Sequence, residues 1–187
     1  MKKKLCLNLL AALLFFSLSA CKKDEQGDSI IPNEEPNGNA QSLYNGVSWD
    51  FDVYSWERLD YPDIYHLTFN HYNEDGLKRG EFNIKNVRLS IGSFLLFEIP
   101  FGSVDIDTIQ KYCDFYPVYS DGDVVGDFYA PIDSSMILTV DQIDTDNRII
   151  SGRFWGKMKK KIAEMEYDPT LPDTIIFSEG TYEVKLD

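Results

Sequence analysis

The sequence has few of the residues that most often bind transition metals or form crosslinks, with two histidines and three cysteines in 187 residues. The histidines, His66 and His71, are five apart, and residues at that spacing on a β-strand face opposite sides, so a shared zinc ion is not expected. Basic residues are also scarce: 18 Lys and Arg oppose 31 Asp and Glu, for a net charge of -13. Because so acidic a chain repels phosphate backbones, we do not expect it to bind nucleic acid.

Catalytic motifs are missing as well. The sequence contains no Gly-x-Ser-x-Gly elbow, no phosphate-binding P-loop and no dinucleotide-binding fingerprint. Paired carboxylates of the glycosidase kind cannot be identified among 31 acidic residues. We therefore expect a protein that is not an enzyme and needs no catalytic cofactor.

The longest apolar run, residues 5–20, is shorter than the roughly 20 residues that a membrane-spanning helix needs. Three lysines, residues 2–4, precede this run, and the small residues Ser-Leu-Ser-Ala end it. This order of a basic region, an apolar region and small residues is typical of a secretory signal peptide.

Residues 18–21, Leu-Ser-Ala-Cys, resemble the lipobox of bacterial lipoproteins. The resemblance implies cleavage after Ala20 and acylation of Cys21, whose acyl chains would hold the protein on a membrane. The alternative is an ordinary secretory signal followed by an incidental cysteine. Residues 22–25, Lys-Lys-Asp-Glu, are similar to the export signal of Bacteroidota lipoproteins, which implies the outer face of the outer membrane, with a periplasm-facing position as the alternative.

Composition divides the chain into three parts. Residues 1–20 are the predicted signal peptide, and residues 21–40 the acylated cysteine and a flexible tether rich in Pro, Gly, Asn and acid. Residues 41–187 are predicted to form a single β domain. Cys113 is then the last unmodified cysteine, and a lone thiol in an oxidising envelope is expected to be buried.

Short segments rich in Tyr, Phe, Ile, Val and Thr, separated by turn residues, predict an all-β fold. We expect an antiparallel β-sandwich or a barrel-like domain, and the spacing does not choose between them. Met158, Ile162 and Met165 recur at helical spacing, so a short helix is the alternative to a strand and loop there. The predicted strands are 46–56, 64–72, 81–91, 93–101, 112–119, 124–130, 135–142, 148–158, 174–178 and 181–187.

Alternation predicts which side chains face the core. The last two strands are expected to form a closing hairpin that turns at Gly180. Segment 93–101 is apolar on both faces, which predicts a central strand covered on both sides. The inward residues of the two clearest strands are Tyr65, Leu67, Phe69, Tyr182, Val184 and Leu186.

Residues 120–187 resemble a group of small uncharacterised all-β lipoproteins of Bacteroidota. The shared pattern is a strand, an Asp-rich turn, an Ile-Ser-Gly-x-Phe strand and a closing hairpin, here in the stretches DGDVVGDFY, ILTVDQIDTDNRIISGRF and LPDTIIFSEGTYEVKL. The resemblance implies the fold class and no catalytic residue.

Clustered carboxylates make calcium the one metal for which the sequence offers ligands, because hard oxygen donors on a loop suit this ion. The first candidate is formed by Asp121, Asp123 and Asp127, and the alternative is a plain Asp-Gly turn. A weaker candidate lies at residues 141–146, which include three further aspartates.

Aromatic residues make up 14% of the chain. Exposed Trp and Tyr rings can stack on the faces of sugars, and Trp56 and Tyr61 in the stretch SWERLDYPD are the candidate binding residues. The alternative is that these rings pack in the core, as aromatics often do in β-proteins.

The sequence thus favours a lipid-anchored cell-envelope protein that works as a non-catalytic surface recognition module for glycan or protein. Its expected partners are a membrane, through acylated Cys21, and a glycan or envelope protein. One alternative is a lipocalin-like carrier of a small apolar ligand, which an apolar cavity would favour. Another is a structural or assembly partner without a ligand, which a flat apolar patch would favour.

Overall fold

The structure, a computed structural model, describes residues 35–59, 61–98, 110–118, 128–133, 135–161 and 170–186. These residues form β-strands joined by turns, with no helix among them, so the predicted all-β class is confirmed. Within these ranges, nothing has the length and apolar character of a membrane-crossing helix. The strands are β1 (Gly38–Tyr44), β2 (Val47–Arg58), β3 (Tyr61–Tyr72), β4 (Lys78–Arg88), β5 (Gly92–Phe97), β6 (Lys111–Pro117), β7 (Phe128–Pro131), β8 (Met136–Asp144), β9 (Ile149–Lys161) and β10 (Thr174–Lys185).

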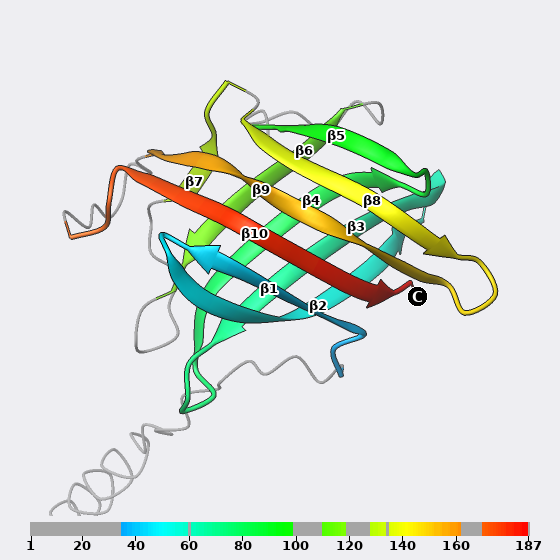
Figure 1. Ribbon diagram of the computed structural model, residues 1–187, viewed down its shortest axis with the longest axis horizontal. Helices are drawn as coiled ribbons and strands as arrows, with labels where there is room; N and C mark the ends of the chain where they lie inside the picture. The colour runs from blue at the N-terminus through cyan, green and yellow to red at the C-terminus, as the bar shows by residue number, and fades with distance from the viewer. Residues whose placement is uncertain are drawn as a thin grey trace, which may run out of the picture. The chain divides into compact units, whose positions relative to one another are not determined.

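The strands close into a barrel, which decides between the two architectures that the sequence left open. Nine strands form the wall in the order β10-β1-β2-β3-β4-β6-β5-β8-β9, and β9 pairs with β10 to close it (Figure 1). The short strand β7 pairs with both β6 and β9. Among the described strands, β5 and β6 are the one parallel pair. Closure pairs the backbone groups of each strand on both sides, so the wall has no long free edge.

Alternate side chains of the wall fill the interior of the barrel, as a period of two predicts. Each inward residue that the sequence assigned to the core on β3, on β10 and directly after β10 is buried. They are Tyr65, Leu67, Phe69, Tyr182, Val184 and Leu186, each with 3% or less of its surface exposed.

Aromatic rings from opposite walls meet in the middle of the barrel. Phe82 of β4 stacks on Phe177 of β10 with 5.1 Å between ring centroids. Phe154 of β9 packs beside both, 5.6 Å from Phe82 and 6.1 Å from Phe177. All three side chains are buried, so the interior is filled with side chains at this level.

Cys113 on β6 is buried in this core, as predicted for a lone thiol. Burial, and then the neighbouring Asp114 carboxylate, raise the pKa of the Cys113 thiol well above its ordinary value. The thiol therefore stays protonated and unreactive at neutral pH.

The glycine of the Ile-Ser-Gly-x-Phe stretch has a packing role. A Cβ atom on Gly152 would overlap the backbone carbonyl of Thr139 on β8 and approach the ring of Tyr182 to 3.0 Å. Glycine at this position lets β8 and β10 pack closely against β9.

The predicted closing hairpin is wrong. Residues 174–185 form one continuous strand, β10, in which the register against β9 shifts between Phe177 and Gly180. Glu179 there has φ of 55°, so the turn chemistry of Ser-Glu-Gly makes a β-bulge rather than a chain reversal. A bulge and a tight turn both need a residue at positive φ, which is why the local sequence misled the prediction.

The structure also extends the β domain toward the N-terminus. Strand β1 begins at Gly38, so residues 38–40, which composition had assigned to the tether, belong to the barrel wall. Ala40 is part of the core, and Asn37 hydrogen-bonds to the backbone of Val53 and Lys185. The stretch lacks β-branched residues, so propensity alone gave no strand signal.

Strands β5 and β9 decide two further predictions, one of which is wrong. Leu95 on β5 is 51% exposed, so the outer face of this strand is not covered and the prediction of a doubly covered strand is wrong. Strand β9 runs to Lys161, which agrees with the strand interpretation of this segment over the helical one as far as residue 161. Residues 162–169 lie outside the described part.

Candidate functional site

Several predicted site residues fall outside the described ranges. Cys21, the expected acylation site, and Asp121, Asp123 and Asp127, the candidate calcium ligands, are among them. Both interpretations therefore remain predictions.

The second acidic stretch is described and is used for structure. Asp144 accepts hydrogen bonds from the backbone N–H groups of Asp146 and Asn147 at 3.0 Å, which caps the turn between β8 and β9. Asp141 accepts two hydrogen bonds from the Arg153 guanidinium, at 2.8 and 3.2 Å. In the described residues no group of three or more His, Cys, Asp or Glu side chains is placed to hold a metal ion.

The histidines lie on opposite faces of β3, as their spacing predicted. His71 points inward and stacks on Trp49, with 3.9 Å between ring centroids. His66 lies outside, 6.2 Å from the ring of the exposed Trp56. They cannot ligate one ion together.

Trp56 and Tyr61, the predicted sugar-stacking residues, are at the end of β2 and the start of β3. Both are exposed, at 46% and 43%. The Arg58 guanidinium lies 4.7 Å above the centre of the Tyr61 ring, which already covers one of its faces. The sugar-binding role of these two rings stays a prediction.

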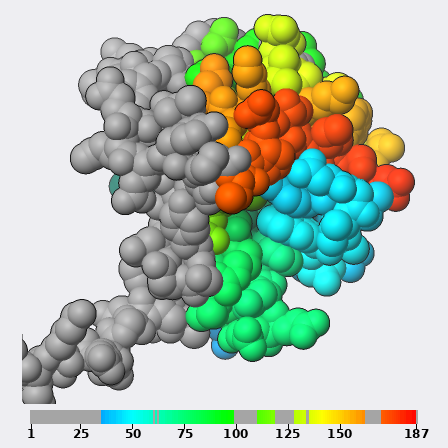
Figure 2. Space-filling view, turned by 90° about the vertical axis from the view of Figure 1, so that its left-hand side faces the viewer, coloured from blue at the N-terminus to red at the C-terminus, as the bar shows by residue number. Residues whose placement is uncertain are grey.

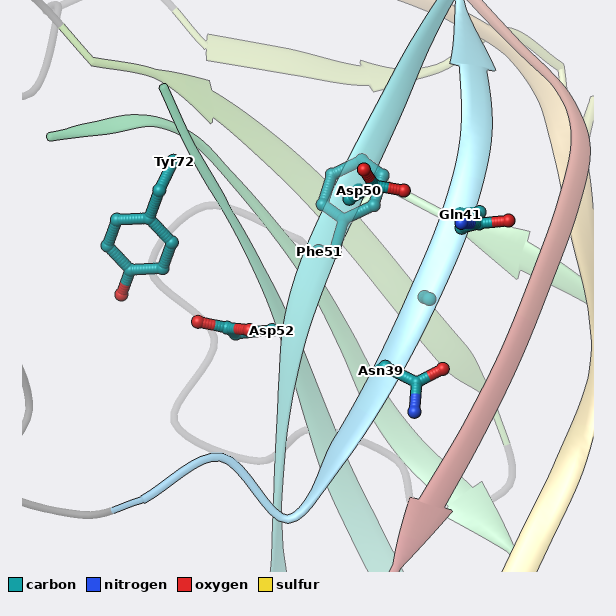
Figure 3. Close-up of a pocket in the computed structure, with 7 residues that line it drawn as sticks. Asn39, Gln41, Asp50, Phe51, Asp52 and Tyr72 are labelled. Carbon is teal, nitrogen blue, oxygen red and sulfur yellow. The ribbon is translucent and has the colours of Figure 1, made fainter. Parts of the chain in front are cut away.

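A different feature, a groove on the outer surface of β1, β2 and β3, brings polar side chains together. Asn39 pairs with Asp52 across the two strands, and Gln41 pairs with Asp50. Tyr72 at the end of β3 completes the lining, and in Figure 3 its hydroxyl points toward the carboxylate of Asp52. The groove has a volume of about 380 Å³. Two carboxylates, two amides and a phenol therefore face one open space.

The groove is the start of a longer row of polar side chains on the outer face of the barrel. The residues in register across β1, β2, β3, β4 and β6 are polar at each strand, and we call this set the first polar row. It consists of Asn39, Asp52, Asn70, Glu81 and Tyr116.

A second polar row lies beside the first, and its members hydrogen-bond to one another. It consists of Tyr54, Thr68, Asn83 and Asp114. Thr68 Oγ1 donates to Asn83 Oδ1 at 2.6 Å, and Asn83 Nδ2 donates to Asp114 Oδ1 at 3.0 Å. Asn83 Nδ2 also donates to Glu81 Oε1 at 2.9 Å, which ties the two rows together.

Asn70 differs from these neighbours. It is buried, with 4% of its surface exposed, yet its Oδ1 atom has no hydrogen-bond partner among the described residues. Its register partners are Asp52 and Glu81, and it hydrogen-bonds to Tyr72 of the groove. An unpaired buried acceptor costs free energy, and a donor from a ligand or water would remove that cost.

The charges of the rows follow from burial and hydrogen bonding. Burial raises the pKa of Tyr72, and hydrogen bonding to Tyr54 raises it further, so the hydroxyl keeps its proton. Burial opposes ionisation of Glu81, but hydrogen bonds from Lys78 and Asn83 outweigh it and lower the Glu81 pKa. Burial raises the pKa of Asp114. In the groove, Tyr72 therefore keeps a hydroxyl proton that it can donate at neutral pH.

No protein-family model matches the chain, and searches of the curated proteins and of the solved structures find no significant match either. The site must therefore be interpreted from its own geometry.

Sequence reasoning did not identify the groove or the two rows. The signal was present in part, because alternate residues of DFDVY, TFNHY and EFNI are polar. That alternation showed only that one face of each strand is directed toward solvent. Which polar residues stand side by side depends on register, and strand register is set by pairing across the barrel.

Proposed function

We propose that the protein is a lipid-anchored surface recognition module that binds a neutral glycan in the groove of β1, β2 and β3. The anchor is Cys21, at the outer membrane. The unpaired acceptor of Asn70, buried beside the groove, is the observation on which the proposal rests most.

The groove has the chemistry that a polyhydroxylated ligand needs. Sugar hydroxyls both donate and accept, and here Asp50 and Asp52 can accept while the amides of Asn39 and Gln41 can donate. The ring of Tyr72 supplies an apolar surface for a sugar face. Because the lining is acidic and the chain carries a net charge of -13, an anionic glycan would be repelled.

The carrier alternative finds less support. A lipocalin-like carrier needs an open apolar interior, and the contact between Phe82 and Phe177 fills the middle of this barrel. The observed polar groove lies on the outside instead, at Asn39, Asp52 and Tyr72.

The test is titration calorimetry of the detergent-solubilised full chain against neutral hexasaccharides of glucan, mannan and xylan, with oligogalacturonate as an anionic comparison. We expect one neutral series to bind, and Gln41→Ala and Asn70→Ala each to raise its Kd at least tenfold. Gln142→Ala is the matched control, because Gln142 is an exposed glutamine on β8, outside the groove. Equal affinity of the Gln41→Ala protein and the control, or binding of oligogalacturonate alone, would contradict the proposal.

A further inference from the structure

One end of the barrel exposes large apolar side chains at neighbouring turns. Leu59, in the turn between β2 and β3, is fully exposed, and Ile91, in the turn between β4 and β5, is 70% exposed. Exposed turns are usually polar, so apolar residues at both tips indicate a surface that contacts something else.

The two turns border one pocket of about 460 Å³. Tyr61, Asp63 and Ile64 line it from the start of β3. Arg88 and the residues directly after it line it from the end of β4. Because one pocket joins the turns, Leu59 and Ile91 belong to a single region, which we call the tip surface.

Basic side chains surround the tip surface, although the chain as a whole is acidic. Arg58 Nη1 donates to Asn86 Oδ1 at 3.1 Å, which holds its guanidinium over the Tyr61 ring. Burial, and to a smaller extent the nearby positive charges of Arg58 and Lys85, lower the pKa of His66 to about 4.

Acidic groups lie near the tip surface too, and one of them, Glu57, is hydrogen-bonded within the turn. The Glu57 carboxylate accepts a hydrogen bond from the backbone N–H of Asp63 at 2.9 Å. Together with Arg88, the tip surface thus combines apolar tips, aromatic rings and guanidinium groups. Side chains of these kinds gather where proteins meet lipid headgroups.

The N-terminal segment enters the barrel at this same end. The side chain of Asn37 hydrogen-bonds to the backbone N–H and the hydroxyl of Ser55, directly before Trp56 on β2. Residues 22–34 separate the predicted acylation site, Cys21, from the first described residue, Glu35. Even fully extended, that length of chain spans at most about 50 Å.

We propose that the tip surface docks on the lipid bilayer to which Cys21 is anchored. Leu59 and Ile91 enter the boundary between headgroups and acyl chains, Trp56 and Tyr61 lie at the headgroup level, and Arg58 and Arg88 contact lipid phosphates. This inference rests on the proposed lipid anchor. It leaves the groove on the side wall of the barrel, open to solvent.

The opposite end supplies a control surface. Val47, the first residue of β2, is 62% exposed and lies at the opposite end of this strand from Leu59. Figure 2 views the barrel from the side where the cyan β1–β2 region, the green β3–β4 region and the orange start of β10 come together. Val47→Asp therefore introduces the same charge far from the tip surface.

The experiment places the lipidated full chain in vesicles of phosphatidylethanolamine and phosphatidylglycerol that carry brominated acyl chains, which quench tryptophan fluorescence on contact. We expect quenching of the wild-type emission, loss of that quenching in Trp56→Phe, and its retention in Trp155→Phe. Leu59→Asp and Ile91→Asp should each reduce it at least twofold, whereas Val47→Asp should not.

The outcomes separate the anchor from the docking. An intact mass without acyl chains overturns the anchor and the docking with it. An acylated chain that stays on the vesicles but shows no quenching at Trp56 overturns the docking alone. Should Leu59→Asp convert a detergent-solubilised dimer to a monomer while quenching stays absent, the tip surface is an interface between two copies, and the lipid proposal fails.

Discussion

On four strands, β2, β3, β4 and β6, residues next to each other in sequence alternate between an apolar inner face and a polar outer face. Across β2, β3, β4 and β6, the inner row in register is Val53, Phe69, Phe82 and Phe115, all of them fully buried. The outer row next to it consists of Asp52, Asn70, Glu81 and Tyr116. The inner row is held by apolar and aromatic packing, whereas the outer row depends on which polar group lies next to which.

The outer face itself contains two kinds of polar residue. Thr68, Asn83 and Asp114 complete one another's hydrogen bonds, so that row contributes to stability. Asn70, whose neighbours include Asp52 and Tyr72 of the groove, has a buried acceptor with no hydrogen-bond partner among the described residues. The two kinds of residue differ in whether their hydrogen bonds are completed within the described residues, and only Asn70 fits the proposed binding role.

The largest expected effect compares the two faces of β10. Val184 is fully buried, so Val184→Asp places an unpaired charge in the core and should lower the free energy of unfolding by about 4 kcal/mol. Glu183 is exposed, and Glu183→Lys should change it by no more than about 0.5 kcal/mol. Urea denaturation of both variants measures the contrast. Equal midpoints would mean that the inward face is misassigned.

A smaller loss is expected in the internally bonded row. Asn83→Ala removes the donor to Asp114 and the acceptor for Thr68, and should lower the free energy of unfolding by about 2 kcal/mol. Asn39→Ala, at an exposed asparagine of the groove, should leave stability unchanged within about 0.5 kcal/mol while weakening glycan binding. The reverse pattern, with the stability loss at Asn39, would exchange the roles assigned to the two rows.

The smallest effect is a pH dependence. Because burial raises the pKa of Asp114, the folded chain binds a proton that the unfolded chain releases at lower pH. Stability from this group should therefore fall as pH rises from about 4, the ordinary carboxyl pKa, through the raised pKa of the folded state. Thermal melts of the wild type and of Asp114→Asn between pH 3 and 8 give the difference curve. A difference that grows in the wild type's favour with rising pH would refute the assignment.

The sequence interpretation succeeded where structure is local and failed where it is not. Alternation on β3 and β10 identified the core residues, because a strand presents alternate side chains to opposite faces wherever it lies. Strand β1 was missed because GNAQSLY has little β-propensity of its own and is held by pairing with β2 and β10. The bulge at Glu179 was taken for a turn because both use positive φ.

The candidate site shows the same division. Trp56 and Tyr61 were chosen as candidates from residue type alone; both rings are exposed rather than packed in the core, and their binding role stays a prediction. The groove was not identified, although each of its residues is visible in the sequence. Asn39, Asp52 and Tyr72 are far apart along the chain, and no local pattern indicates that they line one space.

By itself, the sequence determined the all-β class and the inward faces, since these depend on composition and on a period of two. The lipid anchor at Cys21, inferred from a short motif, stays a prediction. Only the tertiary structure decided that the sheet closes into a barrel, that Phe82 meets Phe177 across it, and that Asp52, Asn70 and Glu81 stand in one row. The physical reason is register: backbone hydrogen bonds form equally well at many offsets, and the burial of one face against strands distant in sequence selects the offset that is adopted.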